Sequence, residues 1–329
     1  MIKLERLGVV LAPEKPDIKT IAKFNAGMVL DGSVVHMVFR YCEWRQGFDP
    51  ARQSNYAVNE IRYARLTPTG RLLEESQRAL IAPTHVWEAS GCEDARVVKF
   101  EDAFYITYTA WDKDSAPLGQ DRARVGVART EDFKTIEKLG IINHDHWDKD
   151  AFLFPERIGG RVAYMHRVEP NIQIDYFDSI EELLDPQSWQ NYAQRVESST
   201  VLRAAYPWEC GKVGGSVPPI RTPKGWLVIY HAVEKLSPAP LDFVYRAGAA
   251  LLDLENPSKV IARLPYPILE PEEDYERVGD VNNVVFPVGG YIYHGDVYIS
   301  YGAADRVTAL AKVRLADLLD ELAKYPFNA

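Results

Sequence analysis

The sequence predicts an all-β protein, a five-bladed β-propeller with a short C-terminal helix, on three observations. Short runs rich in Val, Ile, Tyr and Phe are separated by turns of Gly, Pro, Asp and Asn. Helical periodicity is almost absent from these runs. A three-strand unit recurs about every 55 to 70 residues, a period that indicates propeller blades. We expect residues 1–329 to form one domain.

Each copy of the unit has an inner strand, a turn, a strongly apolar second strand and a third strand. The inner strands are predicted at 27–30, 94–100, 151–158, 216–222 and 283–288. The second strands are predicted at 34–40, 104–110, 161–167, 226–231 and 296–302. The third strands are predicted at 59–66, 124–129, 171–177, 245–254 and 307–315. Five copies fit five blades around one axis.

Three segments fall outside these copies. Residues 180–189 have the pattern of a helical connector. Residues 315–322 carry leucines at i, i+3, i+4 and i+7, the stripe of an amphipathic helix. This helix packs either on a blade of its own subunit or on a second subunit, so a homo-oligomer stays open. Residues 113–122 are expected to form a longer loop.

Composition excludes several classes of protein. A net charge of -9 argues against a nucleic-acid binder, which needs a basic face. No apolar run approaches the length of a membrane span, and the patch at 7–12 is too short for a signal peptide. The three cysteines are far apart and lack C-x-x-C spacing, so neither disulfides nor a zinc site is indicated. We expect a cytoplasmic location and no membrane partner.

Two adjacent carboxylates and an arginine lie in the segment 91–96, at the start of an apolar run. The common interpretation of Glu93, Asp94 and Arg96 is a charge cluster on an edge strand, with Glu93 paired to Arg96. The alternative is sugar chemistry, which needs a carboxylic acid to protonate the departing glycosidic oxygen. Asp94 is the candidate acid, and Glu93 and Asp112 are near alternatives.

Basic residues recur where the second strands end. Aligning these ends matches Arg40, Ala110, Arg167, His231 and Gly302. Equivalent positions of blades lie around one axis, so the basic members can converge on one anion. Guanidinium groups fit phosphate oxygens and a lysine adds a point charge, so Lys212, in the glycine-rich stretch 210–215, joins them, with Lys149 as a weaker addition. Candidate aromatic residues for stacking on sugars are Tyr108, Trp111, Trp208 and Tyr245.

Several segments together resemble glycoside hydrolase family 130, the β-mannoside phosphorylases and related β-mannosidases. Residues 91–96 and 105–112 are similar to the family's G-x-E-D-P-R and Y-x-T-Y-T-A-Y-D segments. Later signatures are matched by 149–156, 225–231, 284–287 and 301–305. The resemblance covers nearly the whole chain, and its motifs are specific only as a set.

The resemblance implies a five-bladed propeller and an inverting reaction. Inorganic phosphate would attack the anomeric carbon of a terminal β-mannosyl unit and release α-mannose 1-phosphate. Asp94 would be the acid, acting through a sugar hydroxyl. The implied sugar-binding residues are Asn25, Arg40, Glu93, Arg96, Tyr108, Asp112, Lys149, Asp150 and Asp305. The implied phosphate-binding residues are Arg62, Arg167, Lys212, His231 and Tyr245. The expected partners are an oligosaccharide and phosphate as co-substrate, with no cofactor and no metal.

The chain departs from the family pattern at three places. Ala95 replaces a proline, the loop at 113–122 is longer, and residues 25–27 follow the first-blade motif only in part. These departures leave open the linkage and the acceptor, which is glucose, mannose or N-acetylglucosamine. A phosphate-independent β-mannosidase on the same scaffold is the main alternative, and a non-catalytic carbohydrate-binding propeller is another. The basic residues Arg167, Lys212 and His231 favour phosphorolysis.

Overall fold

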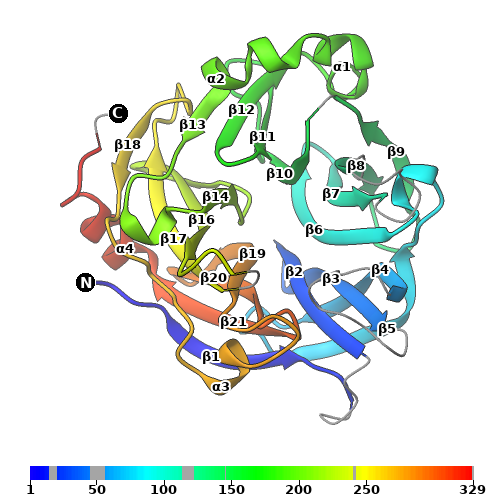
Figure 1. Ribbon diagram of the computed structural model, residues 1–329, viewed down its shortest axis with the longest axis horizontal. Helices are drawn as coiled ribbons and strands as arrows, with labels where there is room; N and C mark the ends of the chain where they lie inside the picture. The colour runs from blue at the N-terminus through cyan, green and yellow to red at the C-terminus, as the bar shows by residue number, and fades with distance from the viewer. Residues whose placement is uncertain (15–20, 45–55, 113–121, 145, 240–241, 328–329) are drawn as a thin grey trace.

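The computed structural model describes residues 1–14, 21–44, 56–112, 122–144, 146–239 and 242–327. Its strands form five antiparallel sheets that surround a central axis as the blades of a closed ring (Figure 1). The predicted five-bladed propeller is therefore confirmed. The expected long loop at 113–122 lies, except for its last residue, outside the described residues.

Each blade is one sheet whose first strand lies nearest the axis (Figure 1). Blades 1 and 2 contain β2 Ile21–Asp31, β3 Val34–Trp44, β4 Tyr56–Leu66 and β5 Leu72–Ile81, then β6 Gly91–Phe100, β7 Ala103–Trp111, β8 Ala123–Thr130 and β9 Glu137–Ile142. Blade 3 contains β10 Asp148–Leu153, β11 Val162–Val168, β12 Ile172–Phe177 and β13 Thr200–Leu202. Blade 4 contains β14 Lys212–Gly215, β15 Ile220–Thr222, β16 Gly225–Lys235, β17 Phe243–Leu252 and β18 Val260–Arg263. Blade 5 contains β19 Val285–Tyr293, β20 Asp296–Ala303, β21 Val307–Arg314 and, from the N-terminus, β1 Glu5–Leu11.

The repeat has four strands, so the predicted three-strand unit was incomplete. The outermost strands were missed because they carry a weak apolar signal, as in β5, where most side chains are exposed or half-buried. All five inner strands differ from their predicted limits, and β2 and β6 begin earlier than expected, at Ile21 and Gly91. Strand β10 begins at Asp148, β14 occupies 212–215 ahead of the expected 216–222, and β19 continues to Tyr293.

The inner strands of blades 1, 2 and 3 each contain a β-bulge at the same point. The bulged residues Asn25, Asp94 and Asp150 have φ values of 50°, 51° and 54°, in the left-handed region. A bulge takes a residue out of the ladder and changes the direction of its side chain. The register pairs Thr109 with Glu93, directly before the bulge, so Thr109 is the blade 2 equivalent of Arg40 and Arg167. The predicted match of Ala110 to these arginines was wrong by one residue.

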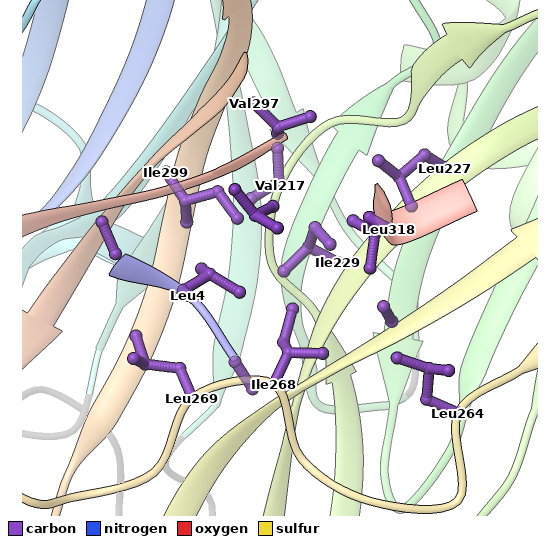
Figure 2. Close-up of a cluster of buried hydrophobic side chains, with 14 of the residues drawn as sticks. Leu4, Val217, Leu227, Ile229, Leu264, Ile268, Leu269, Val297, Ile299 and Leu318 are labelled. Atoms are coloured by element: carbon purple, nitrogen blue, oxygen red, sulfur yellow. The ribbon is translucent and has the colours of Figure 1, made fainter. Parts of the chain in front are cut away.

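Large apolar clusters fill the spaces between neighbouring blades. Figure 2 shows the cluster between blades 4 and 5, where Leu4, the residue before β1, packs near Ile229 of β16 and Ile299 of β20. Helix α4 Leu315–Leu322 adds Leu318 to this cluster. The predicted C-terminal helix is thus confirmed, and it packs on its own chain.

The remaining helices are short and connect strands or blades. These helices are α1 Ile180–Leu184, α2 Val196–Ser199 and α3 Asp274–Arg277. Further connections contain 3-10 turns at Val86–Glu88, Pro186–Trp189, Tyr192–Gln194 and Pro207–Glu209. The predicted connector at 180–189 corresponds to α1 and the turn after it. All three cysteines are free, as expected. Among the described residues, no helix is long and apolar enough to cross a membrane.

Candidate active site

A cavity of about 380 Å³ opens where the inner strands of the blades meet. It collects most of the predicted site residues from segments far apart in the sequence. Those that line it are Asn25, Arg40, Glu93, Asp94, Lys149, Arg167, Lys212, Tyr245 and Asp305. The cavity has a side rich in carboxylates, from blades 1, 2 and 5, and a basic side from blades 3 and 4.

On the carboxylate side, Asp94 is held by residues of blade 1. Its Oδ1 accepts a hydrogen bond from Nδ2 of Asn25 at 2.8 Å and lies 3.5 Å from Nη1 of Arg40. Gly302 of blade 5 makes room for this contact, because a Cβ there would lie 1.8 Å from Oδ1 of Asn25. The position of the Asp94 carboxyl group is therefore fixed by three different blades.

Glu93 connects the cations of the carboxylate side. Its Oε1 accepts hydrogen bonds from Arg40 at 2.8 Å and from Asn59 at 2.9 Å. Its Oε2 lies 3.6 Å from Nζ of Lys149, across the gap between blades 2 and 3. Because Glu93 is buried and contacts all three of these side chains, it can hold Arg40 and Lys149 in position at the cavity.

Asp305, in the turn after β20, lies on the same side of the cavity. Burial raises the pKa of its carboxyl group to about 7, against the opposing charge of Arg40. The negative charges of Asp94 and Asp280 act in the same direction as burial. Near neutral pH this carboxyl group therefore exists in both protonation states, unlike an ordinary aspartate.

Asp150 organises the basic side. Its Oδ1 accepts a hydrogen bond from Nη2 of Arg96 at 2.9 Å, and its Oδ2 lies 3.1 Å from Nε of Arg167. Burial alone would raise the pKa of Asp150, but the charges of Arg167 and Arg96 hold it well below its usual value. Arg96 thus pairs with Asp150, and the suggested pairing with Glu93 is not the one this structure contains.

His231 is fully buried beneath the basic side, and its Nε2 lies 3.6 Å from Oδ2 of Asp150. Burial lowers its pKa well below the usual value, and the charge of Arg167 adds to this despite Asp150, so the imidazole is neutral. A Cβ on Gly214 would lie 2.3 Å from the His231 ring and 3.1 Å from Arg167. The glycine therefore makes room for these side chains, whereas the sequence suggested close approach to a ligand.

Lys212 and Tyr245 complete the basic side together with a glutamate that the sequence analysis missed. Nζ of Lys212 donates a hydrogen bond to Oε1 of Glu169 at 2.8 Å, and Nη2 of Arg167 lies 3.3 Å from the same oxygen. Burial and the charge of Arg167 lower the pKa of Lys212. Burial raises the pKa of Tyr245 far above its usual value, so its hydroxyl group keeps the proton.

Aromatic side chains form one wall of the cavity. Trp111, Trp147 and Phe243 line it, and the Trp147 ring meets that of Trp111 edge-on with centroids 4.9 Å apart. The Trp147 side chain is partly exposed, and Nζ of Lys149 lies 4.4 Å from the Trp111 centroid. Trp111 was a predicted stacking residue, whereas Trp147 and Phe243 were missed. Trp147 lies two residues before the candidate cation Lys149, and this spacing is the sequence signal that could have found it.

The cavity that the described residues form does not include Arg62. Its Nε donates a hydrogen bond to Glu60 at 2.8 Å, and its guanidinium group lies 3.3 Å from the centroid of the Tyr41 ring. Arg62 is on β4, the third strand of its blade, and so lies farther from the axis than Arg40. Its geometry is that of a structural cation within blade 1.

Tyr108 and Asp112 also lie away from the lining of this cavity. The buried Tyr108 hydroxyl donates to Glu88 at 2.7 Å. Asp112 accepts a hydrogen bond from Arg124 at 2.6 Å. Both residues have partners within blade 2, and this placement favours Asp94 over Asp112 as the carboxyl group that faces a ligand.

Three buried residues behind the basic side, His144, Asp148 and His166, lie close enough together to hold a metal ion. Their candidate ligand atoms already contact one another, since Asp148 Oδ2 lies 3.1 Å from His144 Nε2 and 2.9 Å from His166 Nδ1. His166 Nε2 lies 3.0 Å from Asp175. Burial would lower the pKa of His166, but these carboxylates raise it to about 9. With a carboxylate at each ring nitrogen of His166, these residues form a buried ion-pair network.

The family model for beta-1,4-mannooligosaccharide phosphorylase matches residues 7–324. The chain belongs to glycoside hydrolase family 130. Two family 130 relatives come from Thermoanaerobacter sp. (strain X514). One, a 1,2-beta-oligomannan phosphorylase, is 32% identical over 97% of this chain and 99% of its own. The other, a beta-1,2-mannobiose phosphorylase, is 33% identical over 95% of this chain and 98% of its own.

The fold is likewise shared with solved structures of family 130. Beta-1,2-mannobiose phosphorylase from Listeria innocua, solved as a complex with beta-1,2-mannobiose, has a TM-score of 0.76 and 23% sequence identity. The match covers 98% of this chain and all of that one. Since curated family 130 members are glycosyl-transferring phosphorylases, the chain is an enzyme of this class.

Proposed function

We propose that this chain is an inverting phosphorylase that cleaves a terminal β-mannosidic linkage with inorganic phosphate and releases α-mannose 1-phosphate. One observation carries the proposal: a single cavity holds the Asp94 carboxyl group on one side and the cations Arg167 and Lys212 on the other. An inverting reaction needs an acid near the leaving oxygen and a nucleophile at the opposite face of the sugar. The two sides of the cavity supply these two requirements.

In the proposed reaction, a phosphate oxygen forms a bond to the anomeric carbon while the bond to the acceptor oxygen breaks. The leaving oxygen takes the bonding electrons and receives a proton from a sugar hydroxyl group, which is reprotonated by Asp94. Attack from the face opposite the leaving group converts the β-linkage into an α-phosphate. Asn25 and Arg40 keep Asp94 in place, and Arg167 and Lys212 bind the phosphate.

We propose β-1,2-linked mannosides as the substrate class. The support is that two relatives matching nearly the whole chain act, by their names, on 1,2-linked oligomannan and mannobiose. Within the cavity, the wall formed by Trp111 and Trp147 offers aromatic surface to the acceptor sugar.

The test is to incubate the enzyme with β-1,2- and β-1,4-linked mannobiose and with mannosyl-glucose, each with and without inorganic phosphate, and to measure mannose 1-phosphate and free mannose. We expect phosphate-dependent formation of mannose 1-phosphate, fastest from the 1,2-linked substrate. Asp94→Asn should abolish it, whereas Asp102→Asn, at an exposed turn, should not. Free mannose formed at a rate independent of phosphate would instead establish a β-mannosidase. An inactive wild type that still binds mannosides would indicate a carbohydrate-binding propeller.

A further inference from the structure

The basic side of the cavity contains a carboxylate at the point where an anion is expected to bind. Oε1 of Glu169 lies 2.8 Å from Nζ of Lys212 and 3.3 Å from Nη2 of Arg167, so one oxygen bridges both cations. All three residues line the cavity. Carboxylate and phosphate oxygens make the same charge-assisted hydrogen bonds with such cations, and therefore compete for them.

We propose that the Glu169 carboxylate competes with phosphate for Arg167 and Lys212, and so sets the affinity of the enzyme for phosphate. The inference rests on the proposed function, because it assigns phosphate to these two cations. When phosphate binds, Glu169 either leaves the bridging position or stays near the anion and repels it. In either case the glutamate lowers the affinity for phosphate.

Charge balance supports this assignment. The cluster contains three cations and two carboxylates, which leaves one net positive charge; its members are Arg96, Arg167, Lys212, Asp150 and Glu169. A doubly ionised phosphate needs two positive charges for neutrality. Withdrawal of one carboxylate from the cluster supplies the second.

Burial indicates which of the two carboxylates can withdraw. The Asp150 side chain is only 3% exposed and is held by Arg96 as well as Arg167. The Glu169 side chain is 45% exposed, so its carboxylate can turn into solvent without losing hydration. Arg167 remains at the basic side when Glu169 turns away, because it stays paired with Asp150.

The test compares phosphate binding to wild type, Glu169→Gln and Glu169→Ala by isothermal titration calorimetry with inorganic phosphate. Removing a negative charge about 4 Å from the bound anion should lower the Kd for phosphate about tenfold in both variants. The KM for phosphate in turnover should fall in parallel, with little change in the KM for the mannoside. Glu156→Gln is the matched control, since Glu156 pairs with Arg221 at 2.9 Å on the exposed surface of the neighbouring blades and should leave the Kd unchanged.

Each other outcome overturns the inference. An unchanged Kd in the two Glu169 variants would show that the carboxylate does not compete. A higher Kd in either would show that Glu169 positions Arg167 and Lys212 for phosphate. Wild-type enzyme that neither binds phosphate nor depends on it would contradict the proposed function itself. Melting curves of all variants by circular dichroism verify that the compared proteins are folded.

Discussion

Asn25, Asp94 and Asp150 occupy equivalent positions in three successive blades and share a left-handed backbone. Among residues other than glycine, Asn and Asp adopt this conformation most readily, because a short polar side chain can hydrogen-bond locally. The bulge also changes the direction of the side chain. One backbone device, repeated around the ring, thus directs an amide and two carboxyl groups toward the axis. At this position the three blades differ in the side chain that the bulge directs toward the cavity.

Asp305 leads to a prediction about the pH dependence of stability. Its pKa rises from 3.8 to about 7 on folding, so its contribution to stability is complete below about pH 4 and is lost as the pH rises through 7. Asn cannot ionise and avoids this loss. We therefore expect the melting temperature of Asp305→Asn, relative to wild type, to increase between pH 5 and pH 8. Thermal melts at several pH values measure this difference.

The matched control for this experiment is Asp102→Asn, an exposed aspartate in the turn between β6 and β7. Its melting temperature relative to wild type should stay constant over the same pH range. A constant difference for Asp305→Asn as well would mean that the Asp305 carboxyl group titrates normally in the folded protein.

At the residue scale, the sequence predicted the acid from the segment 91–96 and the cations from the aligned strand ends and the glycine-rich stretch 210–215, and the structure places Asp94, Arg167 and Lys212 around one cavity. It did not predict Glu169 or Trp147. Both lie outside the apolar runs whose periodicity indicates strands, in segments whose direction is determined by tertiary packing. Arg62 shows the reverse case, since its residue type suited phosphate but its strand places it away from the cavity.

At the scale of elements, blades 2, 4 and 5 repeat a buried polar contact. A glutamate in the short helix before the inner strand accepts hydrogen bonds from backbone N–H groups, from a tyrosine on the second strand and from a cation on the outermost strand. The three sets are Glu88 with Tyr108 and Lys138, Glu209 with Tyr230 and Arg263, and Glu276 with Tyr301 and Arg6. This contact ties the loop between blades to both the middle and the edge of the sheet.

The repeated contact predicts an order of stability losses. Arg263 is 1% exposed, so Glu209→Gln leaves a buried cation without its counter-charge, at a cost of about 3 to 5 kcal/mol. Lys138 is 27% exposed and can be hydrated, so Glu88→Gln should cost only about 1 to 2 kcal/mol. Urea denaturation followed by circular dichroism measures both. Equal losses, or a larger loss for Glu88→Gln, would show that burial of the cation does not control the cost.

A surface glutamate provides the reference for these two variants. Glu197 pairs with Arg203 at 2.7 Å, but both side chains are well exposed. Glu197→Gln should therefore change the free energy of unfolding by less than about 1 kcal/mol.

The sequence predicted the first three strands of four blades because they are apolar and alternate with clear turns, whereas in blade 4 it placed the inner strand after β14. It failed at the outermost strands, which are either poor in buried side chains, as β5 is, or as short as β13 and β18. The helix at 315–322 was predicted correctly because its leucine stripe is a local pattern. Its packing partner was left open, since a stripe does not identify the surface it meets.

At the scale of the whole molecule, the ring is closed by strand pairing between the two ends of the chain. Strand β1 from the N-terminus pairs antiparallel with β21 and forms the outer strand of blade 5 (Figure 1). Leu4 and Leu11 are buried in the apolar clusters on either side of that blade. The sequence showed only a short apolar patch here, because a contact between residues some 300 positions apart leaves no local periodicity.

Closure by β1 predicts that the N-terminal strand is required for stability. Deleting residues 1–12 removes the β1–β21 ladder, the buried side chains of Leu4 and Leu11, and the ion pair of Arg6 with Glu276. A loss of this size should lower the melting temperature by roughly 10 °C or more. It also exposes β21 as an edge strand, so light scattering should detect association.

Single substitutions in β1 test whether the packing of its side chains, and not only its pairing with β21, contributes to the stability of the protein. Leu11 is 1% exposed and Leu7 is 39% exposed on the same strand. Leu11→Ala should therefore cost about 2 to 5 kcal/mol, and Leu7→Ala less than about 1 kcal/mol. If the shortened chain melted at the wild-type temperature as a monomer, the ring would be stable without its N-terminal strand. In that case the apolar clusters between the blades, and not the pairing of the chain ends, would hold the propeller closed.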